Sequence, residues 1–177
     1  MKKILAWHFT NGMKLRDGQP LVVGKLYKHA GKLVMCESGY HASKDIRDAL
    51  SYAPGFTVSR VECSGEVIED TYKLVCTQRK ALWSFDAKKV VLAWSMRVAT
   101  DAVKTVKKIY RDEAWNRWAD LWISGKDRSA DAASYAADAA SYAAYAAAHA
   151  EARAAAKKKY SRWLITMIEK ARICPSK

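Results

Sequence analysis

The chain of 177 residues lacks long hydrophobic runs. No uninterrupted apolar stretch in it reaches the ~18 residues that a membrane span requires. Polar residues follow Met1 too soon for the apolar region of a secretory signal peptide. Glycine and proline are few, with 8 and 3 residues, while 50% of the composition is hydrophobic. These features disfavour a transmembrane, collagen-like or wholly disordered protein. We expect a globular protein of the cytoplasm with no membrane partner.

Several sequence motifs are also absent. The chain contains no glycine-rich phosphate loop, no zinc-protease histidine pair and no serine-hydrolase elbow, which disfavours common nucleotide hydrolases, zinc proteases and α/β hydrolases. Its four cysteines form no C-x-x-C pair and stand at no zinc-ligand spacing to a histidine. We therefore expect reduced thiols and no metal site; the cysteines are Cys36, Cys63, Cys76 and Cys174.

Acidic residues are few compared with basic residues. The 31 Lys and Arg residues outnumber the 18 Asp and Glu residues, and the net charge of +13 is spread along the chain. A folded surface of this kind attracts nucleic acid, nucleotides, acidic protein faces or anionic lipid. The alternative is that the charge serves solubility alone. The best candidate anion-binding surface is a helical stripe, unless it is simply a solvated face; it consists of Arg97, Lys104, Lys108 and Arg111.

Residues 1–86 alternate short apolar runs with turn signals, which predicts a small mixed α/β domain. The run at 4–10 is a predicted strand that ends in a turn at Asn11-Gly12. Ser43 is the expected N-cap of a short helix at 44–52. Further strands are predicted at 25–28 and 32–36, which would pair as a hairpin, and at 57–63, 66–69, 73–76 and 81–83.

Residues 87–128 are predicted to be helical. Apolar residues recur every three or four positions from Val91 to Ile109, which predicts an amphipathic helix with Asp86 as its N-cap. A second helix follows, and three tryptophans share one of its faces. We expect this face to belong to a core, with a base-stacking platform as the alternative; it consists of Trp115, Trp118 and Trp122.

Residues 129–177 are predicted to form a long Ala-rich helix capped by Ser129, since alanine is the best helix former, followed by a C-terminal amphipathic helix. At ~1.5 Å per residue this helix would exceed a compact domain, so we expect it to protrude or to break near the three lysines at 157–159. A perfect seven-residue repeat places Tyr135, Tyr142 and His149 on one seam. Such a seam predicts packing against another helix of the chain or a homo-oligomer, with a solvated single helix as the alternative. The whole chain is thus predicted to be α+β.

One stretch carries a family resemblance. Cys36-Glu-Ser-Gly-Tyr-His41 is followed by Asp48-Ala-Leu-Ser-Tyr52, and an Ala-rich tail closes the chain. Over roughly residues 5–85 this resembles an uncharacterised domain family found mostly in bacteriophage proteins. The resemblance implies a phage accessory protein that acts in the cytoplasm of the host cell, where it modifies or blocks a host component, including host defence.

A weaker similarity lies within the same region. ADP-ribosyltransferases carry a His on an early strand, a Gly-x-Tyr-x-Ala-Ser block, a second Tyr and a late Glu. This similarity implies that NAD would be held by the corresponding residues, with the Glu orienting the nucleophile or the ribose. The corresponding positions here are His8, the block from Gly39 to Ser43 that contains Tyr40, then Tyr52, and Glu66 or Glu69.

Three functions follow from these observations. The first is a non-enzymatic binding protein that engages and neutralises a host protein or an anionic nucleotide-type ligand, without a cofactor. The second is an NAD-using enzyme with His8, Tyr40, Tyr52 and Glu66 as catalytic residues. The third is nucleic-acid binding by the helical region. The residues expected to bind the ligand are His8, Thr10, Tyr40, His41, Ser43 and Tyr52.

Overall fold

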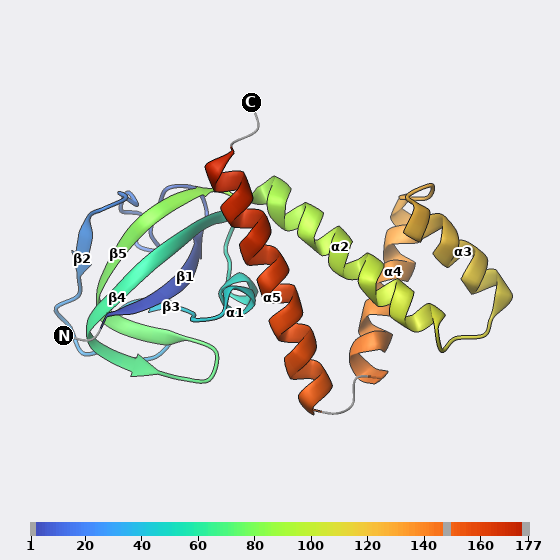
Figure 1. Ribbon diagram of the computed structural model, residues 1–177. Coiled ribbons are helices and arrows are strands. Elements are labelled where there is room, and N and C mark those ends of the chain that lie inside the picture. Colours follow the sequence, from blue (N-terminus) through green and yellow to red (C-terminus); the bar gives the residue numbers. More distant parts are fainter. Residues whose placement is uncertain (1–2, 147–149, 175–177) are drawn as a thin grey trace. The chain divides into compact units, whose positions relative to one another are not determined.

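The computed structural model describes residues 3–146 and 150–174 and confirms the α+β class (Figure 1). Among these residues it has one antiparallel five-stranded sheet and five helices. The elements are β1 (Ile4–Thr10), β2 (Leu26–Lys28), β3 (Tyr40–Ala42), α1 (Ile46–Ser51), β4 (Thr57–Glu69), β5 (Leu74–Asp86), α2 (Lys88–Lys107), α3 (Glu113–Ser124), α4 (Ala130–Ala146) and α5 (Ala150–Ile173).

The chain forms two compact units. The first combines Met1–Val91 with Leu164–Lys177, and the second comprises Leu92–Trp163. This division differs from the three regions expected from composition, because α5 begins in the second unit and ends in the first. We call them the sheet unit and the helical unit.

Two long strands dominate the sheet unit. The sheet order is β1-β4-β5-β2, and β3 also pairs with β5 (Figure 1). The predicted break between strands at 57–63 and 66–69 is wrong, since β4 continues through Ser64 and Gly65 with a register shift between Ser64 and Val67. Gly65 takes φ +80° there. Likewise β5 is continuous where two short strands were predicted.

Two local predictions in the sheet unit are also wrong. Residues 25–28 and 32–36 do not pair as a hairpin, because β2 pairs with β5 and the N–H of Ser38 donates to the carbonyl of Val34 (2.9 Å) in a turn. Asp45, not Ser43, caps α1, since its carboxylate accepts the N–H of Arg47. The backbone of Ser43 is already used in pairing with Trp7.

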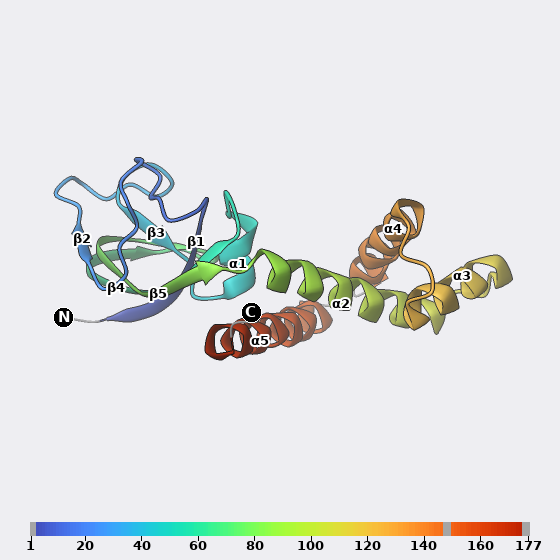
Figure 2. The same cartoon turned by 90° about the horizontal axis from the view of Figure 1, so that it is seen from above.

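The sheet carries buried side chains on both faces. One cluster includes Ala6, Val61 and Cys63, and the loops that connect β1 to β3 lie over one side of the sheet (Figure 2). Elsewhere the Trp7 and Trp83 rings meet edge to face, with their centroids 5.8 Å apart. Burial on both faces explains why the apolar residues of these strands do not alternate strictly with polar ones.

The helical unit packs around tryptophan and alanine. Trp122 is 1% exposed and belongs to a cluster with α2 and α4, so the expected core role of this face is confirmed. The carboxylate of Asp86 accepts the N–H of Lys88 (2.9 Å), as expected of a cap. However, α2 ends at Lys107, and Ile109 beyond it is exposed.

The Ala-rich helix packs through alanines. Ser129 caps α4, because its hydroxyl accepts the N–H of Ala132 (3.2 Å). The buried positions are Ala132, Ala136 and Ala139, while Tyr135 and Tyr142 of the expected seam are exposed. Helix α5 continues through the lysines at 157–159, so no break occurs there. His149, and the question whether α4 and α5 are continuous, lie outside the described residues.

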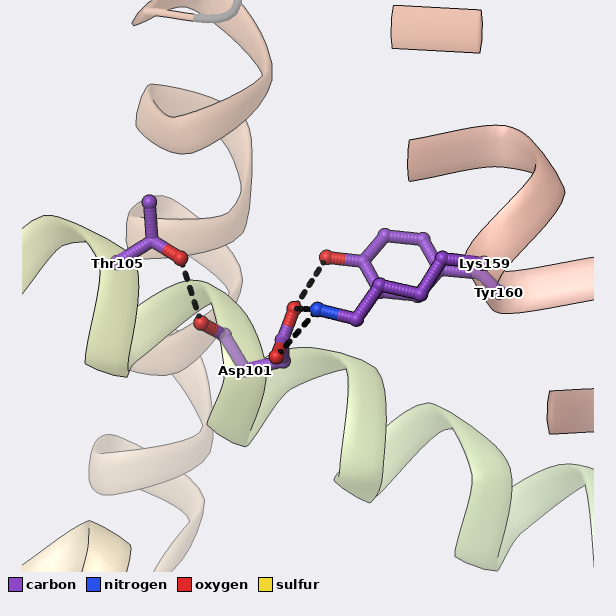
Figure 3. A network of polar contacts seen from close by, with 4 residues as sticks. All are labelled: Asp101, Thr105, Lys159 and Tyr160. Atoms are coloured by element: carbon purple, nitrogen blue, oxygen red, sulfur yellow. Dashed lines mark hydrogen bonds and ion pairs between the residues drawn. The ribbon is translucent and has the colours of Figure 1, made fainter. Parts of the chain in front are cut away.

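A polar network joins α5 to α2 within the helical unit. The Asp101 carboxylate accepts bonds from the ammonium of Lys159 (2.7 Å) and the hydroxyl of Tyr160 (2.9 Å), as Figure 3 shows. The hydroxyl of Thr105 donates to the carbonyl of Asp101 one turn earlier (2.9 Å). The indole N–H of Trp94 adds a bond to the carbonyl of Tyr160 (3.0 Å). These bonds fix the register between the two helices.

Candidate anion-binding site

A buried arginine marks the most unusual polar position in the sheet unit. Arg79 on β5 is 5% exposed, and its guanidinium donates to the carbonyl of His41 (2.6 Å). No carboxylate within residues 3–146 or 150–174 forms an ion pair with it. A guanidinium has five N–H donors and stays protonated at physiological pH. Arg79 therefore brings a full positive charge into the fold without an acidic partner there.

Aromatic rings and a thiol lie next to Arg79. Its guanidinium lies 5.1 Å from the centre of the Tyr40 ring, and Tyr27 lies next to Tyr40 with ring centroids 6.2 Å apart. The Cys76 thiol donates to the carbonyls of Tyr40 (3.3 Å) and Gln78 (3.1 Å). A hydrogen bond with Cys63 lowers the pKa of the Cys76 thiol, and the nearby charge of Arg79 lowers it further.

His8 contributes a neutral imidazole. It lies on β1 opposite Ser59 and is half-buried. Burial lowers the pKa of His8 well below the ordinary value of 6.5, and the charges of Arg79 and His41 lower it further. An imidazole in this state offers one donor and one acceptor at neutral pH.

His41 faces several cations. Its Nε2 accepts the backbone N–H of Cys36 (2.9 Å). Burial lowers the pKa of His41, and Arg79, Lys73 and Arg16 lower it through their positive charges. Three basic side chains from separate segments thus act on one imidazole. This clustering produces the strongly positive local field that favours a bound anion.

The structure brings some of the expected ligand residues together and not others. Tyr40 and His41 contact Arg79, and the charge of Arg79 adds to the lowering of the pKa of His8. Thr10 is buried and its hydroxyl donates to the carbonyl of Gly12 (2.7 Å), which makes it part of a turn. Ser43 is 2% exposed and pairs with β1 through its backbone.

Tyr52 lies at the edge of the same region. It is the C-cap of α1 and is 55% exposed. The ammonium of Lys73 stands 4.8 Å from the centre of its ring, and Lys73 in turn acts on His41. Tyr52 is therefore linked to the Arg79 region through a cation rather than by direct contact.

The expected glutamates lie elsewhere on the sheet. His8 pairs with Ser59, and Glu66 follows Ser59 by seven residues on β4, or about 20 Å along a strand. Glu66 is exposed, and its N–H donates to the hydroxyl of Thr77 (3.0 Å). Glu69 pairs with Lys44. The structure does not bring either carboxylate to His8.

The expected basic stripe is not one helical face. Arg97 stacks on Trp163, with 3.9 Å between the guanidinium carbon and the ring centre. Lys104 is exposed on α2, but α2 ends at Lys107, so Lys108 and Arg111 lie beyond the helix. The prediction of a four-residue stripe on one helix is wrong because the amphipathic pattern outlasts the helix.

The described residues hold neither a candidate membrane span nor a candidate metal site. No helix there has both the length and the apolar character of a membrane span. No group of three or more His, Cys, Asp or Glu side chains gathers there in a way that could hold a metal ion.

Sequence reasoning missed Arg79, the centre of the site. The residue fell between two predicted strands, at 73–76 and 81–83, and was thus assigned to a connection. In the structure β5 runs through it, and Cys63 and Tyr27 are its partners on the neighbouring strands. A buried arginine inside a bulged strand pair gives no periodic signal, so only the structure identifies it.

Comparison with known proteins places the chain in a family without an assigned role. No curated protein and no solved structure matches it. Residues 4–93, just over half of the 177 residues, match the model of one family. That range contains Arg79, His8, Tyr40 and His41. The chain belongs to the family described as "Domain of unknown function (DUF7666)".

Proposed function

We propose that the protein is a non-enzymatic binding protein that takes an anionic, nucleotide-type ligand at Arg79. The observation that carries the proposal is the burial of this guanidinium without a carboxylate partner among the described residues. Burying a charge costs several kcal/mol unless it is paired. A phosphate group would supply the missing counter-charge through short, charge-assisted hydrogen bonds.

The neighbouring side chains favour a nucleotide over a bare anion. Tyr40 and Tyr52 each supply an aromatic ring beside a cation of this region, Arg79 and Lys73 respectively, and such rings bind a flat base by stacking. The neutral imidazoles of His8 and His41 supply donors and acceptors suited to ribose hydroxyls. A ligand with both a phosphate and a planar ring would use all of these groups.

The phage resemblance of residues 36–52 supplies the biological setting for this proposal. A phage accessory protein that binds a nucleotide-type ligand in the host cytoplasm would withhold it from a host component, such as a defence protein. The net charge of +13 supports attraction of an anionic ligand.

Titration calorimetry with adenosine diphosphate (ADP) as the probe tests the proposal. The wild-type protein is expected to bind ADP saturably, and Lys73→Gln to bind it at least about threefold more weakly, because Lys73 adds to the field at His41. Lys80→Gln is the matched control, since Lys80 lies on β5, the strand that follows Lys73, but pairs with Glu62 (3.7 Å); this variant should bind ADP normally. Equal loss in both variants, or no binding by the wild type, would contradict the proposal.

The NAD-using enzyme is the second candidate. The proximity of His8 and Tyr40 through Arg79 favours it, whereas the placement of Glu66 weighs against it. Turnover of NAD by the wild type and its loss in Glu66→Gln would support the enzyme. Binding of NAD without turnover would favour the binding protein.

A further inference from the structure

At the edge of the proposed ligand site, an exposed thiol and an amine lie unusually close together. Lys73 Nζ is 2.7 Å from Cys36 Sγ. Hydrogen bonds from N–H to oxygen measure 2.7–3.2 Å, and sulfur is a larger atom than oxygen. The nitrogen and sulfur are therefore closer than an ordinary N–H···S bond requires, at a separation that one bridging oxygen atom can span.

The backbone of Cys36 is held in a strained conformation. Among the described residues, Cys36 is the only one other than glycine that has a positive φ, at 72°. Its N–H donates to Nε2 of His41 (2.9 Å), and its carbonyl accepts from Arg16 (3.4 Å). Strain that neighbouring groups maintain in this way is a pointer to function. Here it fixes the residue that presents its thiol to Lys73.

Lys73 is also positioned by its surroundings. The N–H of Asp70 donates to the carbonyl of Lys73 (2.8 Å) in the turn before β5. The ammonium lies 4.8 Å from the centre of the Tyr52 ring. The contact thus joins two segments that are 37 residues apart in the sequence, each fixed by its own bonds.

We propose that Cys36 and Lys73 form a covalent sulfur–oxygen–nitrogen crosslink when an oxidant of the peroxide class is present. One peroxide oxidises the thiol to a sulfenic acid and leaves as water. A second peroxide oxidises the pair further. The amine first gives up its ammonium proton; then one N–H hydrogen and the O–H hydrogen of the sulfenic acid are removed, an N–O bond forms, and the peroxide becomes two waters. In sum, one thiol, one amine and two peroxides give the crosslink and three waters. Two dithiol molecules supply the four hydrogens that regenerate thiol and amine with release of one water.

The crosslink would change the region in two ways. It would tie the turn around Cys36 to the start of β5, and it would remove the positive charge of Lys73 from the vicinity of His41. Neither step depends on the proposed ligand, so the crosslink stands or falls independently of the proposed function.

Peptide mapping and intact mass of protein treated with hydrogen peroxide test the inference. The Cys174→Ser variant is the starting protein, because Cys174 is the other exposed thiol while Cys63 and Cys76 are buried. We expect a joined peptide pair containing Cys36 and Lys73, with a mass gain of about 14 Da that dithiothreitol reverses. Lys73→Arg and Cys36→Ser should each abolish this species, and the control Lys80→Arg should retain it.

Other products would overturn the inference. They are a gain of about 16 or 32 Da on Cys36 with no joined peptide, which is simple thiol oxidation, or a joined species that persists in Lys73→Arg. Unmodified Cys36 after treatment that oxidises exposed methionines would overturn it as well. Thermal unfolding of each variant, compared with the starting protein, confirms that the fold is retained.

Discussion

Arg79 and His8 show at the residue scale how burial sets the charge of a side chain. Arg79 keeps its charge inside the fold because a guanidinium does not lose its proton at physiological pH. His8 instead stays neutral at physiological pH, since burial and the charge of Arg79 both lower its pKa. The result is one fixed cation beside a neutral imidazole. This combination suits a ligand that carries both phosphate and hydroxyl groups.

Stability is predicted to fall on mild acidification. The folded state lowers the pKa values of His8 and His41, so below their unfolded value of about 6.5 the unfolded state binds more protons. Their contribution is present above pH ~6.5 and is lost as pH falls toward the folded values. Arg79, Lys73 and Arg16 face His41 and oppose its protonation. Urea denaturation across this range measures the slope.

The His8→Gln variant supplies the control for this pH dependence. Glutamine cannot titrate, so the free energy of unfolding should vary less with pH between pH ~6.5 and ~5. A variant with the full wild-type slope would show that His8 is not the group responsible.

The sequence could indicate His8, Tyr40 and His41 because they stand in recognisable motifs next to turn signals. It could not indicate that Arg79 meets them, because their contact arises from the pairing of β3 with β5 across more than thirty residues of chain. The pairing in turn depends on the loop geometry, which no periodicity describes.

At the scale of elements, the bulge in β4 shapes the sheet. Gly65 takes φ +80°, and a Cβ there would lie 2.1 Å from the Thr77 hydroxyl oxygen. The bulge lets β4 continue where two strands were predicted. Such bulges bend a strand and increase its twist, which is why a Ser-Gly pair here continues the strand instead of ending it.

Replacing Gly65 by alanine is predicted to destabilise the protein by about 2–3 kcal/mol, because both the positive φ and the clash with Thr77 must be accommodated. Gly24→Ala is the matched control: Gly24 has φ +84°, and a Cβ added there would meet nothing within 4 Å. It should cost only about 1 kcal/mol. Equal costs in chemical denaturation would show that the contact with Thr77 is unimportant.

The Asp101 network is predicted to hold α2 and α5 together. Asp101→Ala should destabilise the helical unit by about 1–2 kcal/mol, since it leaves Tyr160 and Lys159 without their acceptor. Asp120→Ala serves as the comparison, because Asp120 is 66% exposed in its pair with Lys107 and should cost less than about 1 kcal/mol. Thermal unfolding that ranks the two variants in the opposite order would contradict this account.

Helix positions were more predictable than strand pairings. The cap at Ser129 and the tryptophan face follow from local chemistry and three- and four-residue spacing. The end of α2 at Lys107 did not follow, because the apolar spacing continues to Ile109 while the backbone does not. Helical periodicity indicates which residues share one face of a helix, but it does not by itself indicate where the helix ends.

At the scale of the whole molecule, the last part of the chain belongs with the first. Leu164 and Ile168 are fully buried, and Arg172 lies over the Trp83 ring at 5.2 Å. Composition alone grouped these residues with the Ala-rich helix, because no glycine or proline separates them from it in the sequence. The assignment to the sheet unit depends on contacts between segments at opposite ends of the sequence.

Ile168→Ala is predicted to destabilise the protein by about 2–4 kcal/mol through the cavity it leaves. Ile173→Ala removes the same atoms from a side chain that is 68% exposed and should change stability by less than about 0.5 kcal/mol. Chemical denaturation followed by tryptophan fluorescence measures both. A negligible effect of Ile168→Ala would show that the end of α5 does not stabilise the fold.

The most direct test of the central claim is ADP binding and stability of Arg79→Met, measured together. Methionine fills the buried space without the cost of an unpaired charge, so the variant should stay folded with stability within about 1 kcal/mol of the wild type. ADP affinity should fall by at least about tenfold, because the charge that pairs with phosphate is gone. Unchanged ADP affinity in a folded Arg79→Met protein would contradict the account.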